Sequence, residues 1–155
     1  SLKVLKNDRP NILLIVLESF SAKMIEPLGG EKDVAPTLNQ LAQEGILFSN
    51  FYANSFRTDR GLSCLLSGYP SQPKFSIMRQ PKISNNLPNI GNKLSQTGYE
   101  LGFYYGGDEN FTNMRSYLVQ ANFLNIISDK DFNKKELHQV SLFPILPSIS
   151  YTFRF

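Results

Sequence analysis

The chain of 155 residues has one cysteine, Cys64, one histidine, His138, and no apolar run long enough to span a membrane. A single cysteine excludes an intrachain disulfide and a zinc site built from several cysteines. The net charge is +3, but the basic residues are scattered and form no cluster with aromatic side chains. We therefore expect no nucleic-acid partner, whereas an anionic, phosphate-bearing substrate is compatible with this charge.

Short apolar runs alternate with segments of helical spacing, and 41% of the residues are hydrophobic, enough for one domain with a core. The pattern predicts strands over residues 11–17, 46–52 and 99–105, and helices over residues 35–45, 58–68, 87–97 and 110–120. A long polar loop with four prolines, residues 69–88, is typical of an active-site edge. This alternation predicts an α/β fold with a mainly parallel sheet flanked by helices.

Glu18 ends the first predicted strand, where six consecutive aliphatic residues, 12–17, give way to a carboxylate. A continuous apolar run is typical of a strand buried on both faces of a parallel sheet. Ligands of open α/β sheets bind just beyond the carboxyl ends of such strands. Glu18 is therefore a candidate metal ligand or acid–base group, and a solvated glutamate at a strand end is the alternative.

Thr58 follows the second predicted strand and opens a predicted helix. One interpretation is a hydroxyl that caps the helix. The other is a nucleophile, because the positive end of a helix favours anionic substrates. A threonine hydroxyl needs a metal or a base to become reactive. Glu18 would help to hold such a metal, with Mg²⁺ and Mn²⁺ suited to oxygen ligands and Zn²⁺ as a further candidate.

Basic side chains near these positions have two interpretations each. Arg115 follows the third predicted strand and is either a bidentate phosphate ligand or an exposed helix residue. Arg57 and Arg60 flank Thr58 and either steer an anion or lie in solvent. Asp108 is interpreted as a loop or capping residue rather than a metal ligand.

Four segments, in this order and spacing, resemble the lipoteichoic acid synthase group of the alkaline phosphatase and sulfatase superfamily. They are residues 11–20, 35–39, 48–52 and 57–61. The resemblance extends over roughly residues 9–132. It implies an alkaline phosphatase-like fold in which residues 1–135 form the N-terminal portion of a catalytic domain.

The resemblance also implies a metal-dependent phosphotransferase. Glu18 matches a ligand of the catalytic metal, Thr58 matches the residue that is both nucleophile and metal ligand, and Arg115 resembles an arginine that contacts the substrate phosphate. The metal implied is Mn²⁺, with Zn²⁺ or Mg²⁺ as alternatives. The substrate would be a phosphate-bearing lipid or a glycerophosphate-type group, and the parent protein would be anchored at the extracytoplasmic face of a bacterial membrane.

The sequence departs from this pattern toward its end. The Asp–His pair that completes the family's metal site is absent, and the lone His138 has Leu137 and Gln139 as neighbours. Residues 136–155 form an atypical tail, which we interpret as a frameshift, a truncation or a divergent end. A sheet cut short would expose an edge strand, which favours a homo-oligomer. Two hypotheses stay open: a phosphotransferase domain, and an inactive remnant that binds an anionic ligand or a partner chain.

Sulfatases belong to the same superfamily but carry a C/S-x-P-x-R signature, whose first residue becomes formylglycine. Cys64 is followed by neither the proline nor the arginine of that signature, and Thr58 cannot undergo the conversion. Paired aspartates of sulfatases are replaced by Glu18 and Ser19. The sequence therefore favours phosphotransfer over sulfatase activity.

Overall fold

The computed structural model describes residues 9–133 of the chain. In chain order these residues form η1 (Ala22–Met24), η2 (Glu26–Leu28), α1 (Pro36–Glu44), α2 (Thr58–Ser67), η3 (Ile77–Arg79), α3 (Pro81–Ser84), α4 (Ile90–Gln96), β1 (Gly102–Tyr104), η4 (Phe111–Asn113), α5 (Met114–Gln120), β2 (Asn125–Ile127) and α6 (Asp129–Asn133), where η marks a 3₁₀ helix. The predicted tail, residues 136–155, and His138 lie outside the described residues.

The sheet consists of β1 and β2, which run parallel with Phe103 opposite Ile126. Parallel neighbours require a crossover connection, and α5 lies in the segment that joins these two strands. The backbone N–H of Tyr105 donates to the carbonyl of Ile127 over 2.8 Å, which extends the pairing one residue past β1. The carboxyl end of β1 is thereby fixed to its neighbour.

One hydrophobic cluster joins α2 to the sheet and to α5. Its buried members are Leu62, Leu66, Met78, Met114, Tyr117 and Leu118, and the partly buried side chains packed against them are Phe103, Tyr105, Phe123 and Ile126. Removing this apolar surface from water is the main source of stability for the body that spans residues 58–133. Because α2 and β1 share the cluster, the start of α2 and the end of β1 are held in one rigid unit.

Proline and glycine set the helix ends, as the sequence predicts. Pro36 occupies the first turn of α1, where a missing N–H does no harm. Gly68 ends α2 in the left-handed conformation, with φ of 63°, and its N–H bonds to the carbonyl of Cys64 over 2.9 Å. The predicted helices over residues 35–45, 58–68, 87–97 and 110–120 correspond to α1, α2, α4 and α5, with shorter bounds for α4 and α5.

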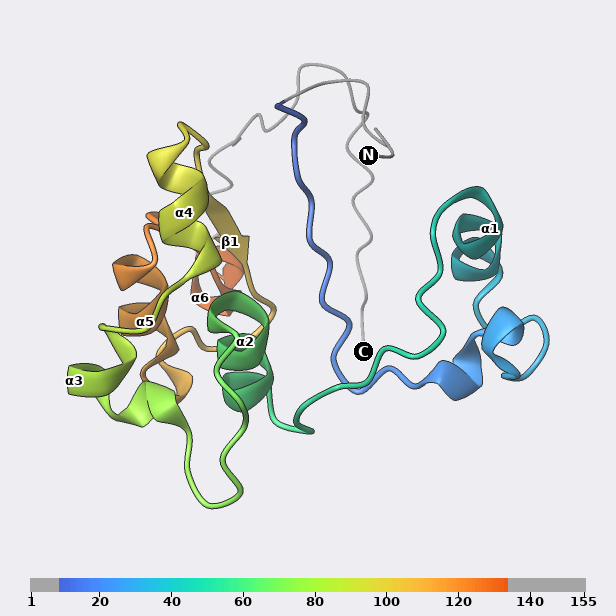
Figure 1. The fold of residues 1–155 in the computed structure, drawn as a ribbon, viewed down its shortest axis with the longest axis horizontal. Helices are drawn as coiled ribbons and strands as arrows, with labels where there is room; N and C mark the ends of the chain where they lie inside the picture. Colours follow the sequence, from blue (N-terminus) through green and yellow to red (C-terminus); the bar gives the residue numbers. More distant parts are fainter. Residues whose placement is uncertain (1–8, 134–155) are drawn as a thin grey trace.

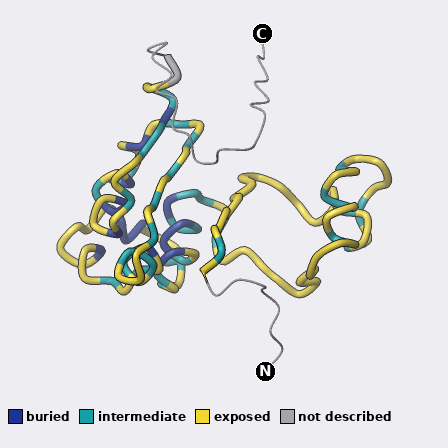
Figure 2. The backbone as a smooth tube through the Cα atoms, turned by 90° about the horizontal axis from the view of Figure 1, so that it is seen from above, coloured by how far each residue is buried: buried dark blue, intermediate teal, exposed yellow. Residues whose placement is uncertain are grey.

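Residues 19–53 extend away from this body as an arm that carries η1, η2 and α1 (Figure 1). Asn39 of α1 accepts a hydrogen bond from the N–H of Glu26 over 3.0 Å, which ties α1 to η2. None of residues 9–57 is buried, whereas the buried residues gather within residues 58–133 (Figure 2). The arm therefore contributes nothing to the hydrophobic cluster.

The predicted strands over residues 11–17 and 46–52 are wrong for this structure, because neither segment joins a sheet. A strand needs a hydrogen-bonding neighbour, and within residues 9–133 the only strand pairing is that of β1 with β2. The aliphatic side chains of residues 12–17 are consequently 50–79% exposed. Apolar composition predicts a preference for a buried strand but cannot supply the neighbour.

Residues 10–18 are nevertheless attached to the body at both ends. The Tyr99 hydroxyl donates to the carbonyl of Pro10 over 3.0 Å, and the Arg9 guanidinium lies 5.8 Å from the centre of the Tyr99 ring. At the other end, the hydroxyl of Thr58 donates to the carboxylate of Glu18. The segment therefore runs in the same direction as β1.

Two further differences concern short elements. The loop predicted over residues 69–88 contains η3 and α3, and Ile77 and Met78 of η3 are buried. The sequence does not predict strand β2, because a segment of three residues is too short to show strand periodicity.

We expect Leu118→Ala to lower the free energy of unfolding by about 2–5 kcal/mol, because it leaves a cavity in the cluster. Leu118 has no exposed surface, whereas its neighbour Val119 is 41% exposed. Val119→Ala should therefore change the stability by less than about 1 kcal/mol. Urea unfolding followed by circular dichroism measures both, and equal losses in the two variants would contradict this description of the core.

Candidate functional site

Glu18 and Thr58, two of the predicted site residues, meet in the structure. They lie 40 positions apart in the chain, and the Thr58 hydroxyl donates a hydrogen bond to Glu18 Oε1. The Thr58 side chain is half-buried at the start of α2, and Glu18 ends the exposed segment that runs beside the body. A hydroxyl whose proton points at a carboxylate is oriented as a nucleophile beside its base would be.

The alternative interpretation of Thr58 as a helix cap is wrong. Arg57 is the N-cap of α2, with extended φ and ψ of −114° and 135°, and Thr58 is the first helical residue. The Thr58 hydroxyl bonds to Glu18 instead of to the helix backbone. The first N–H groups of α2 lack carbonyl partners within the helix, so an anion is favoured beside Thr58.

Tyr105 completes this group, although the sequence interpretation did not select it. Its phenol lies near Thr58 and Glu18, because both residues influence its pKa. Burial raises the pKa of the phenol above its ordinary value, the Glu18 carboxylate raises it further, and the hydrogen bond with Thr58 lowers it. The rule that selected Glu18, a polar group at the carboxyl end of a predicted strand, applies equally to Tyr105.

The arginines beside Thr58 are engaged by other groups. Arg57 Nε lies 3.4 Å from Oδ1 of Asp59, a carboxylate that is 1% exposed in the first turn of α2. Arg60 Nη1 donates to the carbonyl of Pro73 over 2.9 Å. These contacts hold the loop at residue 73 and the first turn of α2, so neither guanidinium is aligned on Thr58.

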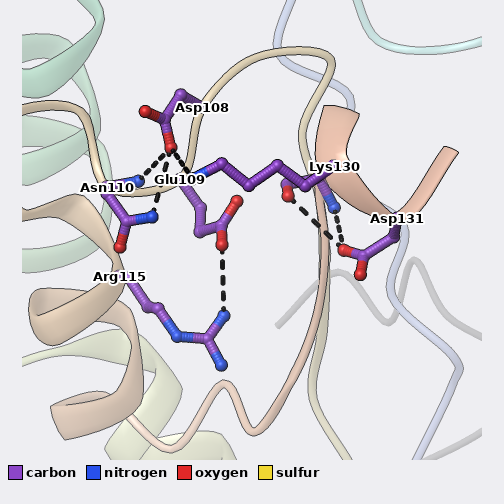
Figure 3. Close-up of polar contacts among 7 residues, drawn as sticks. Asp108, Glu109, Asn110, Arg115, Lys130 and Asp131 are labelled. Carbon is purple, nitrogen blue, oxygen red and sulfur yellow. Dashed lines mark hydrogen bonds and ion pairs between the residues drawn. The ribbon is translucent and has the colours of Figure 1, made fainter. Parts of the chain in front are cut away.

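Arg115, the predicted substrate-binding residue, lies in a polar cluster between the end of β1 and α6 (Figure 3). Its Nη1 is 3.6 Å from Glu109 Oε1, and half of its side chain is exposed. A hydrogen bond from Ser128 is the main cause that lowers the pKa of Glu109, and the charge of Arg115 adds to it. The guanidinium is therefore paired with a protein carboxylate in this structure.

Asp108 belongs to the same cluster and lies in a loop, as the sequence predicts. Its Oδ1 accepts hydrogen bonds from Lys130 Nζ over 2.9 Å and from the N–H of Asn110 over 3.0 Å. The hydrogen bond from Lys130 is the first cause that lowers the pKa of Asp108, and the bond from Asn110 is the second. Asp108 therefore caps the turn that follows β1.

Cys64 lies on α2, and its Sγ is 3.4 Å from Oδ1 of Asn54. Burial raises the pKa of this thiol, which keeps it protonated and poorly nucleophilic at neutral pH. Asn54 also accepts from the N–H of Ser71 over 2.7 Å. This geometry suits a structural role for Cys64.

The Glu18 and Thr58 pair offers part of a metal site. A carboxylate and a hydroxyl are hard oxygen donors of the kind that Mg²⁺ and Mn²⁺ prefer. Within residues 9–133, however, no group of three or more His, Cys, Asp or Glu side chains is placed to hold a metal ion. The donor type therefore fits a divalent ion, but these two donors alone would leave its coordination incomplete.

The opposing effects on Tyr105 give a test of this geometry. Glu18→Gln removes a nearby negative charge and should lower the pKa of Tyr105, whereas Thr58→Ala removes a hydrogen bond and should raise it. Glu44→Gln, on α1 in the arm, is the control and should leave this pKa unchanged. The ¹³Cζ shift of Tyr105, followed by NMR against pH, reports each value. Shifts of the same sign in the two site variants would contradict the arrangement.

Comparison with known proteins supports the superfamily that the sequence resembles. The family model described as Sulfatase matches residues 10–140. A solved structure of an alkaline phosphatase superfamily protein from Vibrio parahaemolyticus aligns with a TM-score of 0.66 and 32% identity, covering 74% of this chain and 28% of that one. The alkaline phosphatase-like fold predicted from the sequence is thereby confirmed.

The curated relatives are named as sulfatases. The Delta 4,5-hexuronate-2-O-sulfatase of Bacteroides thetaiotaomicron is 22% identical over 130 residues, which cover 81% of this chain and 27% of the relative. The ulvan-active sulfatase of Formosa agariphila is 37% identical over 73 residues, 46% of this chain and 12% of the relative. The chain thus spans about a quarter or less of the length of these relatives. Because the family model matches most of its residues, the chain belongs to the sulfatase family of the alkaline phosphatase superfamily.

Proposed function

We propose that this chain is part of a metal-dependent phosphotransferase or phosphodiesterase that uses Thr58 as its nucleophile. The substrate class is a phosphoglycerol-like or related anionic head group, presented at the extracytoplasmic face of a bacterial membrane. The observation that carries the proposal is the hydrogen bond from the Thr58 hydroxyl to Glu18, made at a helix N-terminus and across 40 positions of sequence. Within residues 9–133, no helix is both long and apolar enough to cross a bilayer.

The reaction proceeds in two displacements. Thr58 Oγ attacks the phosphorus of the phosphodiester and its proton passes to Glu18; the bond from phosphorus to the leaving alcohol breaks, and that oxygen takes the proton from Glu18. An acceptor hydroxyl or water then attacks the phosphorus and gives its proton to Glu18, and the oxygen of Thr58 leaves and takes that proton. The N–H groups at the start of α2 stabilise the added negative charge on the phosphoryl oxygens.

Glu18 and Thr58 would hold the metal of this site, together with ligands from outside the described residues. A divalent ion bound there supplies Lewis acidity, which lowers the pKa of the Thr58 hydroxyl and neutralises charge on the phosphoryl group. Mn²⁺ is our first choice, with Zn²⁺ and Mg²⁺ as alternatives. Arg115 would contact the substrate phosphate after exchanging its present partner, Glu109.

Hydrolysis of sulfate esters is the second candidate, because the curated relatives are sulfatases. A sulfate ester and a phosphodiester are both tetrahedral monoanions, so a helix N-terminus receives either. The position of the only cysteine argues against this candidate. Cys64 is followed by Leu65 and Leu66, lies beyond the first turn of α2, and is hydrogen-bonded to Asn54.

An inactive remnant that binds an anionic ligand or a partner chain is the third candidate. Its support is the incomplete donor set around Glu18 and Thr58 within residues 9–133. The experiments below separate it from the two enzymatic candidates.

We expect Thr58→Ala to abolish turnover of a chromogenic phosphodiester, such as bis-p-nitrophenyl phosphate, by the natively expressed protein with Mn²⁺. Thr58→Ser keeps a hydroxyl and should retain measurable activity. Removal of metal by EDTA should stop the reaction, and added Mn²⁺ should restore it. Undiminished turnover by Thr58→Ala would refute the nucleophile. Turnover of p-nitrophenyl sulfate in place of the phosphodiester would favour the sulfatase candidate.

Metal binding by the chain itself is a separate prediction. Mn²⁺ should broaden the NMR signals of residues around Glu18 and Thr58, and Glu18→Gln should weaken this binding by about tenfold or more. Glu44→Gln, a carboxylate on α1 in the exposed arm, is the matched control. Equal binding by both variants would refute Glu18 as a metal ligand, and no binding by the wild type would favour the remnant hypothesis.

A further inference from the structure

Glu109 is a buried carboxylate whose charge is matched by one cation. Its side chain is 10% exposed, and within residues 9–133 its one ion pair is with Arg115, whose Nη1 lies 3.6 Å from Oε1. The other carboxylate oxygen, Oε2, is buried and has no hydrogen-bond partner among these residues. A carboxylate beside a guanidinium is ionised at neutral pH, and burial leaves its charge weakly screened. Glu109 therefore acts on any charged group that comes to Arg115.

The main chain fixes Glu109 and Arg115 relative to each other. The N–H of Arg115 donates to the carbonyl of Glu109 over 2.8 Å. Met114, directly before Arg115, is fully buried in the hydrophobic cluster. The side chain of Asn113, at the start of α5, donates to the carbonyl of Met78 over 3.2 Å. Because half of the Arg115 side chain is exposed, its guanidinium can turn to another partner while the buried carboxylate stays in place.

The polar cluster around this pair has no excess of positive charge (Figure 3). Its second cation, Lys130, lies 2.9 Å from Oδ1 of Asp108. A third carboxylate, that of Asp131, accepts a hydrogen bond from the N–H of Ser128 over 2.9 Å. The two cations, Arg115 and Lys130, are thus faced by three carboxylates. A second negative charge on a ligand of this cluster consequently brings no further attraction.

We propose that Glu109 is a specificity-determining residue that makes Arg115 select anions with a single negative charge. This inference rests on the proposed role of Arg115 as a phosphate-binding residue. When the guanidinium turns from Glu109 to a phosphoryl group, the carboxylate stays nearby and repels the ligand in proportion to the charge of the ligand. A phosphate monoester carries close to two charges above about pH 7, whereas a phosphodiester carries one. The substrate class is thereby narrowed to monoanions, and phosphate monoesters are disfavoured.

Two small ligands test this selection in the full chain without any turnover. At about pH 8 methyl phosphate is a dianion, whereas dimethyl phosphate is a monoanion. NMR titrations with EDTA present, followed at the backbone N–H signals around Arg115, give both dissociation constants. We expect the wild type to bind methyl phosphate no more tightly than dimethyl phosphate. A preference of the wild type for methyl phosphate of about tenfold or more would overturn the inference, and this comparison needs no variant.

Glu109→Gln keeps the size of the side chain and removes its charge. It should strengthen the binding of dimethyl phosphate by about threefold and that of methyl phosphate by about tenfold, because the repulsion that is removed is proportional to the charge of the ligand. A purely structural role would change both dissociation constants by the same factor, so their ratio is the decisive measurement. An unchanged ratio contradicts the proposed role of Glu109. Glu109→Asp keeps the charge and should keep the ratio of the wild type.

Glu100→Gln is the matched control for the change of charge. Glu100 is exposed and precedes β1, whereas the polar cluster follows the carboxyl end of the same strand. The loss of this charge should leave the ratio of the two dissociation constants unchanged, because exposed charges at a distance are screened. A change of ratio as large as that in Glu109→Gln would assign the effect to overall charge and refute a specific role of Glu109.

The outcomes distinguish this inference from the proposed nucleophile. If turnover depends on Thr58 and the ratio is unchanged in Glu109→Gln, the inference fails and the nucleophile stands. If Thr58→Ala is fully active and the ratio changes as expected, the nucleophile fails and the inference is supported. If the wild type binds neither ligand, Arg115 is not a phosphate-binding residue, and the inference fails with that part of the proposed function.

Discussion

The packing of α2 against α5 and β1 is the constraint on which the rest of the described structure depends. Leu62 and Leu66 of α2 lie in the same buried cluster as Met114 and Leu118 of α5. This contact fixes the first turn of α2 against the carboxyl end of β1, and neither element is long enough to be stable alone. The Thr58 hydroxyl at the start of α2 and the Tyr105 phenol just past the end of β1 are consequently carried by one packed body, to whose core the exposed arm contributes nothing.

Local sequence signals predicted the helices well and the sheet poorly, for one physical reason. The ends of α1 and α2 are set by Pro36 and Gly68, whose backbone restrictions act at the residue itself. Strand formation in residues 11–17 depends on a neighbour that is distant in sequence, and apolar composition says nothing about whether that neighbour is present. The pairing of Glu18 with Thr58 was predictable because both follow apolar runs, a pattern expected at the carboxyl ends of parallel strands, and the two residues meet although neither run joins the sheet. The position of the Tyr105 ring could not be predicted from the sequence, because it depends on packing against the hydrophobic cluster and the backbone at Gly107.

Family membership and chemistry are separate questions here. A hydroxyl at a helix N-terminus beside a carboxylate provides a nucleophile, partial positive charge and a metal donor, and each of these serves sulfate and phosphate esters alike. The named relatives act on sulfated compounds, whereas this chain has Thr58 at the start of α2 and a protonated Cys64 further along the same helix. The difference between the two chemistries therefore rests on the nucleophile and its ligands, which the fold leaves free to vary.

The attachment of residues 10–18 at both ends has an entropic consequence. A free chain of this length loses much conformational freedom when it joins a sheet. Here the carbonyl of Pro10 is already held by Tyr99, and Glu18 is already held by Thr58. Part of the loop-closure cost of adding a third parallel strand is thus met before any strand hydrogen bond forms. The same two contacts hold both ends of the aliphatic run from Ile12 to Leu17 at the body, so the run is already extended beside it.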